Sequence, residues 1–172
     1  HIIALHNEVK EVLWTLGKGH TKTPEIHTVN ITKAGTQKFT FSWNSPAQIS
    51  LSTPLSYLYE PNAAILKSGA FNHMCGAFKV LKLHKHSHLY TSQDLVDFPG
   101  RRFKIEKVVP YSKKQMRSSI DFEKANISTR NFPETVARLQ EKWKLQQGGA
   151  RYLFFTTIEN DKKIVLICFS PN

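Results

Sequence analysis

Eight residues in the second half of the chain have side chains that could bind a phosphate group. Seven of them are cations and the eighth is an amide: Arg101, Arg102, Lys113, Lys114, Arg117, Arg130, Asn131 and Lys142. Residues 101–151 hold thirteen Lys/Arg against five Asp/Glu, residues 1–100 hold nine against six, and residues 152–172 hold two against two. In a chain with a net charge of +11, so dense a basic segment favours a nucleic acid as partner. A solvated basic surface without a ligand is the alternative.

The stretch ANISTRNFP, residues 125–133, has the most specific pattern of this group. Its alternation predicts a strand that runs into Arg130, and Pro133 is typical of the first residue of a helix. Free N–H groups at a helix start favour an anion, and a guanidinium matches phosphate oxygens as a fork. We therefore expect Arg130 to contact a phosphate, supported by the cations of residues 113–117. The alternative is an ion pair between Arg130 and Glu134 that only steadies the corner.

Three aromatic residues, Tyr111, Phe122 and Phe132, lie among these cations in the sequence. Exposed aromatic rings beside basic groups can stack on nucleic-acid bases while the cations bind phosphates. The segment is therefore interpreted as a surface that binds phosphates and stacks bases.

Motifs of catalysis are missing from the sequence. It contains no G-x-G-x-x-G, no Walker loop and no H-E-x-x-H, and neither Cys75 nor Cys168 has a neighbouring histidine that could activate it. The two cysteines also lack the spacing of a metal or redox site. We therefore expect no catalytic, cofactor-binding or metal-binding residues in this chain.

Two further stretches have weaker patterns. In HKHSH, the residues His84, His86 and His88 would share one face of a strand, which is a possible metal geometry. Because no thiolate or carboxylate lies beside them, we interpret them as a polar strand edge. In YEPN, residues 59–62, Glu60 is expected to cap the following helix, and a contact between domains is the alternative.

The elements of the first 99 residues are predicted from periodicity and turn residues. A strand at 2–5 and a helix that starts at Asn7 are followed by two strands at 26–32 and 37–43, with a turn at Ala34–Gly35. A connection leads to one helix over about 63–78 and a short strand at 80–83. The loop DFPG at 97–100 is taken as a domain boundary.

Residues 100–172 have a regular β-α-β-α-β-β order. Strands are expected at 102–110, 122–130, 151–158 and 162–170, with helices at 112–119 and 133–145, the second stopped by Gly148–Gly149. The simplest packing is a mixed sheet with both helices on one face, so the fold class is α+β. Trp143, at helical spacing from Leu139, is expected to be a buried anchor.

The sequence also carries information about the setting of the chain. No apolar run approaches the roughly 20 residues of a membrane-spanning helix, and the start lacks the pattern of a signal peptide. Two well-separated cysteines fit a reducing compartment, so a cytoplasmic location without membrane contact is expected. Because His1 lies inside a predicted strand, we expect the chain to be a piece of a longer protein.

Five segments of the chain resemble a known family. YLYEPNAAILKSGAF, HLYTS, FPGRRFKI, KANISTRNFP and QQGGARYLFFTT occur in the order seen in the C-terminal region of a bacterial family of class I SAM-dependent methyltransferases. In the Bacteroidetes type of this family, that region holds a ferredoxin-like domain and then a THUMP-like domain. The resemblance extends over nearly the whole chain.

The resemblance implies a division into three parts and a function. Residues 1–43 would be the tail of the Rossmann-like methyltransferase domain, 44–99 a linking, ferredoxin-like region and 100–172 the THUMP-like domain. The Gly-rich SAM-binding motif of the family is absent here. The intact protein would thus use S-adenosylmethionine and include a further N-terminal methyltransferase domain, while this chain would bind RNA and would not be catalytic alone. The alternative is a structural or protein-interaction module that packs on the catalytic domain without binding nucleic acid.

Overall fold

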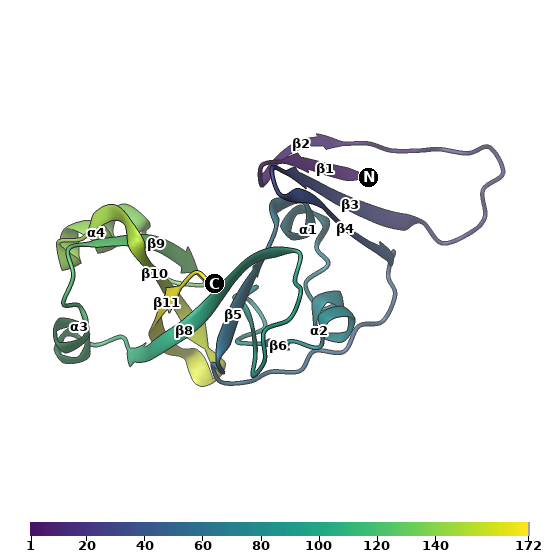
Figure 1. The fold of residues 1–172 in the computed structure, drawn as a ribbon. Helices are drawn as coiled ribbons and strands as arrows, with labels where there is room; N and C mark the ends of the chain where they lie inside the picture. The colour runs from purple at the N-terminus through teal and green to yellow at the C-terminus, as the bar shows by residue number, and fades with distance from the viewer. Residues whose placement is uncertain (172) are drawn as a thin grey trace.

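A computed structural model describes residues 1–171, which form two mixed β-sheets with four short α-helices (Figure 1). The first sheet has four strands in the order β2-β1-β3-β4. Their bounds are β1 Ile2–Leu5, β2 Glu8–Val12, β3 Glu25–Thr32 and β4 Gly35–Ser42. β1 runs parallel to β3, and the other two pairs are antiparallel. The β3–β4 turn is at 33–34, one residue before the predicted position, because Thr32 pairs with Gly35.

The helix predicted to start at Asn7 is wrong, since residues 8–12 form strand β2. His6 and Asn7 have φ values of 50° and 65° and make a two-residue turn between β1 and β2. Turns with two left-handed residues match the twist of a hairpin, and Asn is among the residues that adopt them most easily. Val9 and Val12 are β-branched, and Val9 packs against the core of the sheet.

The second sheet has seven strands in the order β6-β7-β5-β8-β11-β10-β9. Their bounds are β5 Tyr57–Pro61, β6 Leu81–Lys82, β7 Tyr90–Ser92, β8 Gly100–Pro110, β9 Lys124–Arg130, β10 Gln146–Ile158 and β11 Lys162–Phe169. Only β9 and β10 pair in parallel. The first half of β8 pairs with β5 and its second half with β11. One continuous sheet therefore joins the residues before and after Gly100.

The single helix predicted for residues 63–78 is two helices, α1 Ala63–Ser68 and α2 His73–Phe78. Gly69 ends α1 in the left-handed conformation at φ 76°, which glycine adopts without steric cost. Asn62 caps α1 through its side-chain oxygen, which accepts from the N–H of Ile65. The prediction that Glu60 caps this helix is therefore wrong.

The prediction that both later helices lie on one face of the sheet is confirmed. α3 Lys113–Ser119 and α4 Val136–Trp143 cover a core to which they contribute Met116 and Leu139. α4 begins three residues later than predicted because Thr135 is its cap, and it ends where Lys144 turns left-handed. The glycines at 148–149 lie in β10, beside an irregularity in its pairing with β9. Trp143 is only partly buried.

The opposite face of the sheet is covered by the segment between β6 and β7. Leu83 and Leu89 from this segment pack with Leu58, Phe103 and Phe154 of the strands. Residues 84–88 form a turn here, so the three histidines do not share one face of a strand. None of the helices described within residues 1–171 is long and apolar enough to cross a bilayer.

Candidate nucleic-acid interface

The predicted phosphate-binding residues lie at both ends of β8 rather than in one place. Arg101 is near the start of β8, whereas Lys113 follows its end. A strand of eleven residues spans roughly 36 Å at the usual rise per residue. The eight residues therefore do not form one compact site.

The first group consists of three cations on α3. Ser112 caps this helix by accepting from the N–H of Gln115, and Met116 anchors it in the core. Lys113, Lys114 and Arg117 are exposed, and within residues 1–171 none of them makes an ion pair. Their charge is therefore available to an external anion.

The second group surrounds Glu134 at the start of α4. The Lys142 ammonium lies 3.0 Å from its Oε2 atom and the Arg138 Nε lies 3.7 Å away. The Tyr111 hydroxyl donates to Glu134 Oε1 at 2.5 Å and accepts from Lys142 Nζ at 2.8 Å. The hydrogen bond from Tyr111 and the nearby cations lower the pKa of Glu134. The pKa of Lys142 is raised chiefly by its hydrogen bond to Tyr111, so this ammonium stays charged. Its charge is partly offset by the carboxylate of Glu134.

The third group is built on a carboxylate that the sequence did not single out as an ion-pair partner. Glu60 has only 3% of its side chain exposed and pairs with both Arg101 and Arg130. The Nε atom of Arg101 donates to Glu60 Oε2 at 2.7 Å, and an amino group of Arg130 lies 2.7 Å from Oε1. One carboxylate thus joins strand β5 to β8 and to the end of β9. The signal available in the sequence was an acid directly after the apolar residues YLY.

The environment of the two guanidinium groups differs. Arg101 lies over the rings of Phe103 and Phe154 and donates to the Ser128 hydroxyl at 3.3 Å. The buried Nε of Arg130 has no hydrogen-bond partner within the described residues. The side chains are 42% and 38% exposed, so both reach solvent.

The corner after β9 is not the start of a helix, which corrects the geometry expected for Arg130. α4 begins only at Val136, and Arg130 pairs with Glu60 rather than with Glu134. Asn131 adopts φ 52°, and its side-chain amide lies 3.1 Å from His84 Nδ1. Its carbonyl accepts from the Thr157 hydroxyl at 2.6 Å. The free N–H groups of a helix start are therefore not beside Arg130.

The remaining predicted cation, Arg102, lies apart from all three groups. It faces Asp97 at 3.4 Å, and both side chains are exposed. Exposed pairs of this kind contribute little to stability.

The aromatic residues do not form the exposed stacking surface that was predicted. Tyr111 and Phe132 pack edge to face with ring centroids 4.9 Å apart, and both contact the core under α3 and α4. Phe122 is partly buried and lies against the Arg151 guanidinium at 4.5 Å. The surface over α3 and α4 therefore presents basic side chains to solvent rather than aromatic rings.

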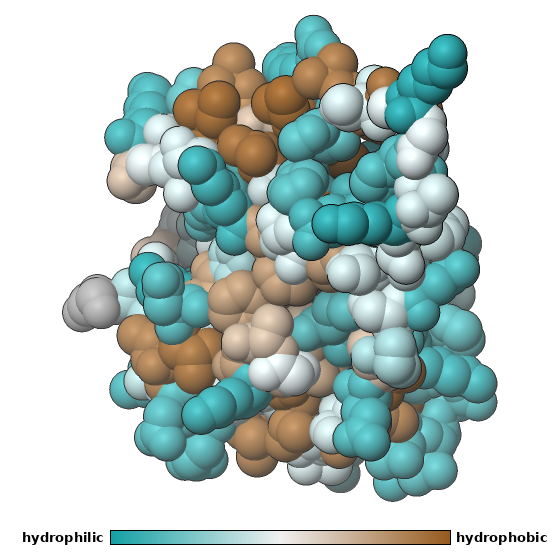
Figure 2. Space-filling model, turned by 90° about the vertical axis from the view of Figure 1, so that its right-hand side faces the viewer, coloured by the Kyte–Doolittle hydropathy of each residue, from teal (hydrophilic) through white to brown (hydrophobic). Residues whose placement is uncertain are grey.

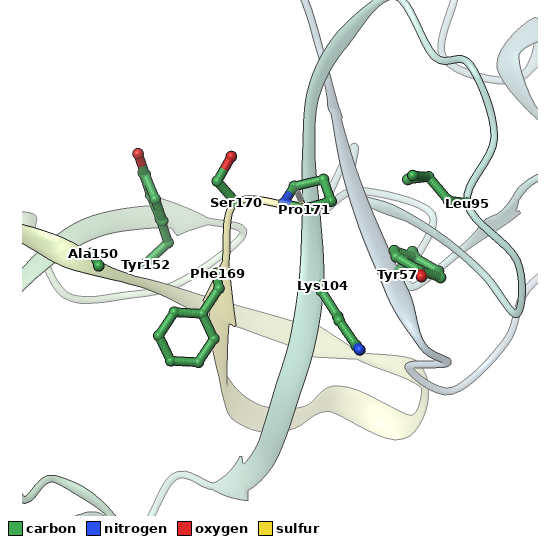
Figure 3. A pocket seen from close by; sticks show the side chains of 8 residues that line it. All are labelled: Tyr57, Leu95, Lys104, Ala150, Tyr152, Phe169, Ser170 and Pro171. Carbon is green, nitrogen blue, oxygen red and sulfur yellow. The ribbon is translucent and has the colours of Figure 1, made fainter.

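A hollow of about 670 Å³ lies beside β8 and the end of β11 (Figure 3). Its lining includes Tyr57, Lys104, Tyr152 and Phe169, but no carboxylate, imidazole or thiol. Figure 3 shows Tyr152 and Phe169 pointing to opposite sides of their strands. Within residues 1–171, no three His, Cys, Asp or Glu side chains come together as metal ligands.

Comparison with known families accounts for most of this architecture. Residues 57–99 match the model of a ferredoxin-like domain, and residues 100–169 match that of a THUMP domain-like family. The chain contains both domains. The resemblance predicted from the sequence motifs is confirmed, and the two domains share the seven-stranded sheet.

A solved structure resembles the chain over its whole length. The crystal structure of a "putative methyltransferase" from Porphyromonas gingivalis W83 matches 100% of this chain with 32% sequence identity and a TM-score of 0.90. The chain spans 45% of the length of that protein. Among curated proteins, none matches the chain.

Proposed function

We propose that the chain is the accessory, RNA-binding part of a SAM-dependent RNA methyltransferase and is not catalytic by itself. The THUMP-like domain and the likeness to the Porphyromonas protein support an accessory part of a methyltransferase. S-adenosylmethionine would be bound by another part of the intact enzyme, since this sequence contains no Gly-rich turn of the kind that binds the cofactor.

The observation that carries the RNA-binding role is the unpaired charge of α3. Lys113, Lys114 and Arg117 project from one short helix and meet no acid within residues 1–171. A protein that places cations on phosphates releases condensed counterions, so an exposed basic helix can bind RNA without a deep pocket. Arg138 and Lys142 extend the positive surface over α4, although Glu134 offsets part of their charge.

The arginines that hold Glu60 have a different place in this proposal. Arg101 and Arg130 already neutralise a buried carboxylate, so an incoming phosphate would compete with that ion pair. Two guanidinium groups against one carboxylate nevertheless leave one surplus positive charge. We therefore expect Arg101 and Arg130, with the adjacent Arg102 and Asn131, to contribute less to RNA affinity than α3 does.

Two triple variants with the same change in net charge test the role of α3. In the first, Lys113, Lys114 and Arg117 are replaced by Gln. In the control, Lys18, Lys22 and Lys33, which are also exposed, are replaced by Gln. Binding to a structured RNA is measured by fluorescence anisotropy at several salt concentrations.

The α3 variant should bind more weakly and lower the slope of log K against log salt by about two to three, roughly one for each lost phosphate contact. The control should keep the parent's slope, because its lysines lie outside the proposed interface. Equal effects of the two variants would mean that only net charge matters. A parent that shows no salt-sensitive binding would refute the RNA-binding role.

A further inference from the structure

The two central strands of the four-stranded sheet, β1 and β3, carry apolar side chains on both faces, although only one face is covered. On the covered side, Ile2 and Ala4 of β1 pack with Ile26 of β3 against Ala64 of α1. The alternation of a strand places Ile3 and Leu5 on the opposite face of β1. It places Val29 and Ile31 on that same face of β3. Leu5 is 41% exposed and Ile31 is 44% exposed.

The four open-face residues form one patch, which we call the β1–β3 patch: Ile3, Leu5, Val29 and Ile31. In the parallel register, Ile3 pairs with Val29 and Leu5 pairs with Ile31. A sheet with antiparallel pairs commonly leaves one face in water, and that face then usually carries polar side chains. Here the central strands β1 and β3 carry apolar side chains on it instead. These apolar side chains therefore lack a covering layer.

The distribution of exposed apolar side chains supports the same conclusion. Within residues 1–171, eleven large hydrophobic residues are exposed, and nine of them lie in the first 51 residues, where Trp14 and Leu16 are 85% and 90% exposed. Figure 2 shows apolar surface at the top of the molecule, the height at which Figure 1 places the four-stranded sheet. The two exceptions, Leu95 and Val108, lie elsewhere in the fold.

The strands flanking the β1–β3 patch carry charge of both signs. On one side, β2 pairs Glu8 and Glu11 with the patch residues of β1. On the other side, β4 pairs Lys38 with Val29. An apolar centre with a mixed polar rim is the anatomy of a protein–protein interface, whereas a nucleic-acid surface is predominantly basic.

We propose that the catalytic part of the methyltransferase docks on the β1–β3 patch and supplies the missing layer. This inference rests on the proposed function. The Porphyromonas protein retains the whole of this chain's fold, including the four-stranded sheet, and this chain spans only 45% of it. The rest of such a protein has no counterpart here. Linked in one polypeptide, it would meet the patch at high effective concentration, which favours it over a second copy as the occupant.

The test measures docking of two pieces and uses variants matched in exposure. The probe is the part of the Porphyromonas methyltransferase that has no counterpart here, purified separately, shown to be folded by circular dichroism and titrated calorimetrically into the 172-residue chain. The variant Leu5→Thr/Ile31→Thr makes the patch polar but keeps residues suited to strands. The control Leu95→Thr/Val108→Thr removes side chains that are 43% and 42% exposed, outside the patch.

The parent chain and the control should form a one-to-one complex, and the patch variant should bind at least about tenfold more weakly with an unchanged melting temperature. No complex with the parent, or equal binding by both variants, would overturn the proposal. The proposal would also be overturned if light scattering showed that the parent chain is a dimer and that the patch variant is a monomer. The occupant of the patch would then be a second copy of the chain. RNA binding, measured on the same proteins, reports separately on the proposed function.

Discussion

At the scale of single residues, Glu60 is an almost fully buried carboxylate held by two arginines. A carboxylate with 3% exposure loses nearly all of its hydration, and two guanidinium groups replace it. Such an ion pair is weak in net stabilisation but costly to break, because the partner left behind is a buried charge. Here the partners reach solvent, which moderates that cost.

Glu60→Gln should lower the free energy of unfolding by about 2 kcal/mol, less than the 3–5 expected for a pair buried on both sides. The reason is that Arg101 and Arg130 are each roughly 40% exposed and can recover part of their hydration. The control Asp97→Asn breaks an exposed pair with Arg102 and should change stability by less than about 0.5 kcal/mol. Urea denaturation of both variants measures the difference; equal losses would mean that Glu60 is not the charge centre we describe.

His88 should make the protein sensitive to acid. Burial, assisted by the positive charges of Lys82, His86 and Arg130, lowers its pKa from 6.5 to about 4. Because the folded pKa lies below the unfolded one, its contribution to stability is present above pH 6.5 and is lost as the pH falls towards 4. The ring stacks on that of Phe71 with centroids 3.6 Å apart, which keeps it partly buried.

His88→Asn should flatten the loss of stability between pH 6.5 and 4. Asn tolerates the positive φ of this position, 52°, so the turn is preserved. Denaturation midpoints at pH 7 and pH 4.5 are compared with those of His20→Asn, which changes an exposed histidine. If both variants follow the parent curve, His88 is not the group that titrates.

At the scale of elements, the close approach of β5 and β8 depends on Gly100. Strand β8 begins at this residue, opposite Pro61. A Cβ atom here would lie 2.1 Å from the carbonyl oxygen of Glu60 and 2.8 Å from the backbone nitrogen of Asn62. Both neighbours are backbone atoms, which cannot move aside as a flexible side chain would.

Gly100→Ala should therefore cost at least about 3 kcal/mol, because the two strands must separate to admit one methyl group. Gly76→Ala is the matched control, since its Cβ would meet nothing within 4 Å and it lies in α2. That change should stabilise the protein by about 0.5–1 kcal/mol through helix propensity. Thermal unfolding of the two variants should thus shift in opposite directions. A Gly100→Ala protein as stable as the parent would contradict the described strand pairing.

At the scale of the whole molecule, the ferredoxin-like and THUMP-like domains share one sheet and one core. Leu58, Leu83 and Leu89 from the first domain cover Phe154 and Leu166 of the second. Separating the domains would expose this apolar face to water. The boundary between two family models is therefore not a boundary between two folding units.

We expect β5 and β11 to open only in the same global unfolding event. Native-state hydrogen exchange should give their amides the same free energy of opening, to within about 1 kcal/mol. The amides of β2, an edge strand with mostly exposed residues, should exchange at a lower free energy and serve as the internal comparison. Exchange of β5 well before β11 would show that the domains unfold separately.

Local patterns were sufficient where an element depends on its own residues. The amphipathic spacing around Leu139 predicted α4, and the local order of strand and helix patterns predicted α3, β8 and β11. The helix predicted from Asn7 failed because Val9 fits either period, and pairing with β1 decided in favour of a strand. The exposed charge of α3 was likewise readable, since a surface cation needs no distant partner.

Long-range pairing decided the rest of the site. Glu134 was the carboxylate considered as an alternative partner for Arg130, but Glu60, from a different domain, pairs with it. Sequence alone determined the basic segment, the helices of the THUMP-like domain and the family, because these depend on composition and local order. Only the tertiary structure decided which cations are free and which apolar strands stay open. Ion pairing and burial depend on which strands lie side by side, and the continuous sheet brings together Glu60 and Arg101, 41 residues apart.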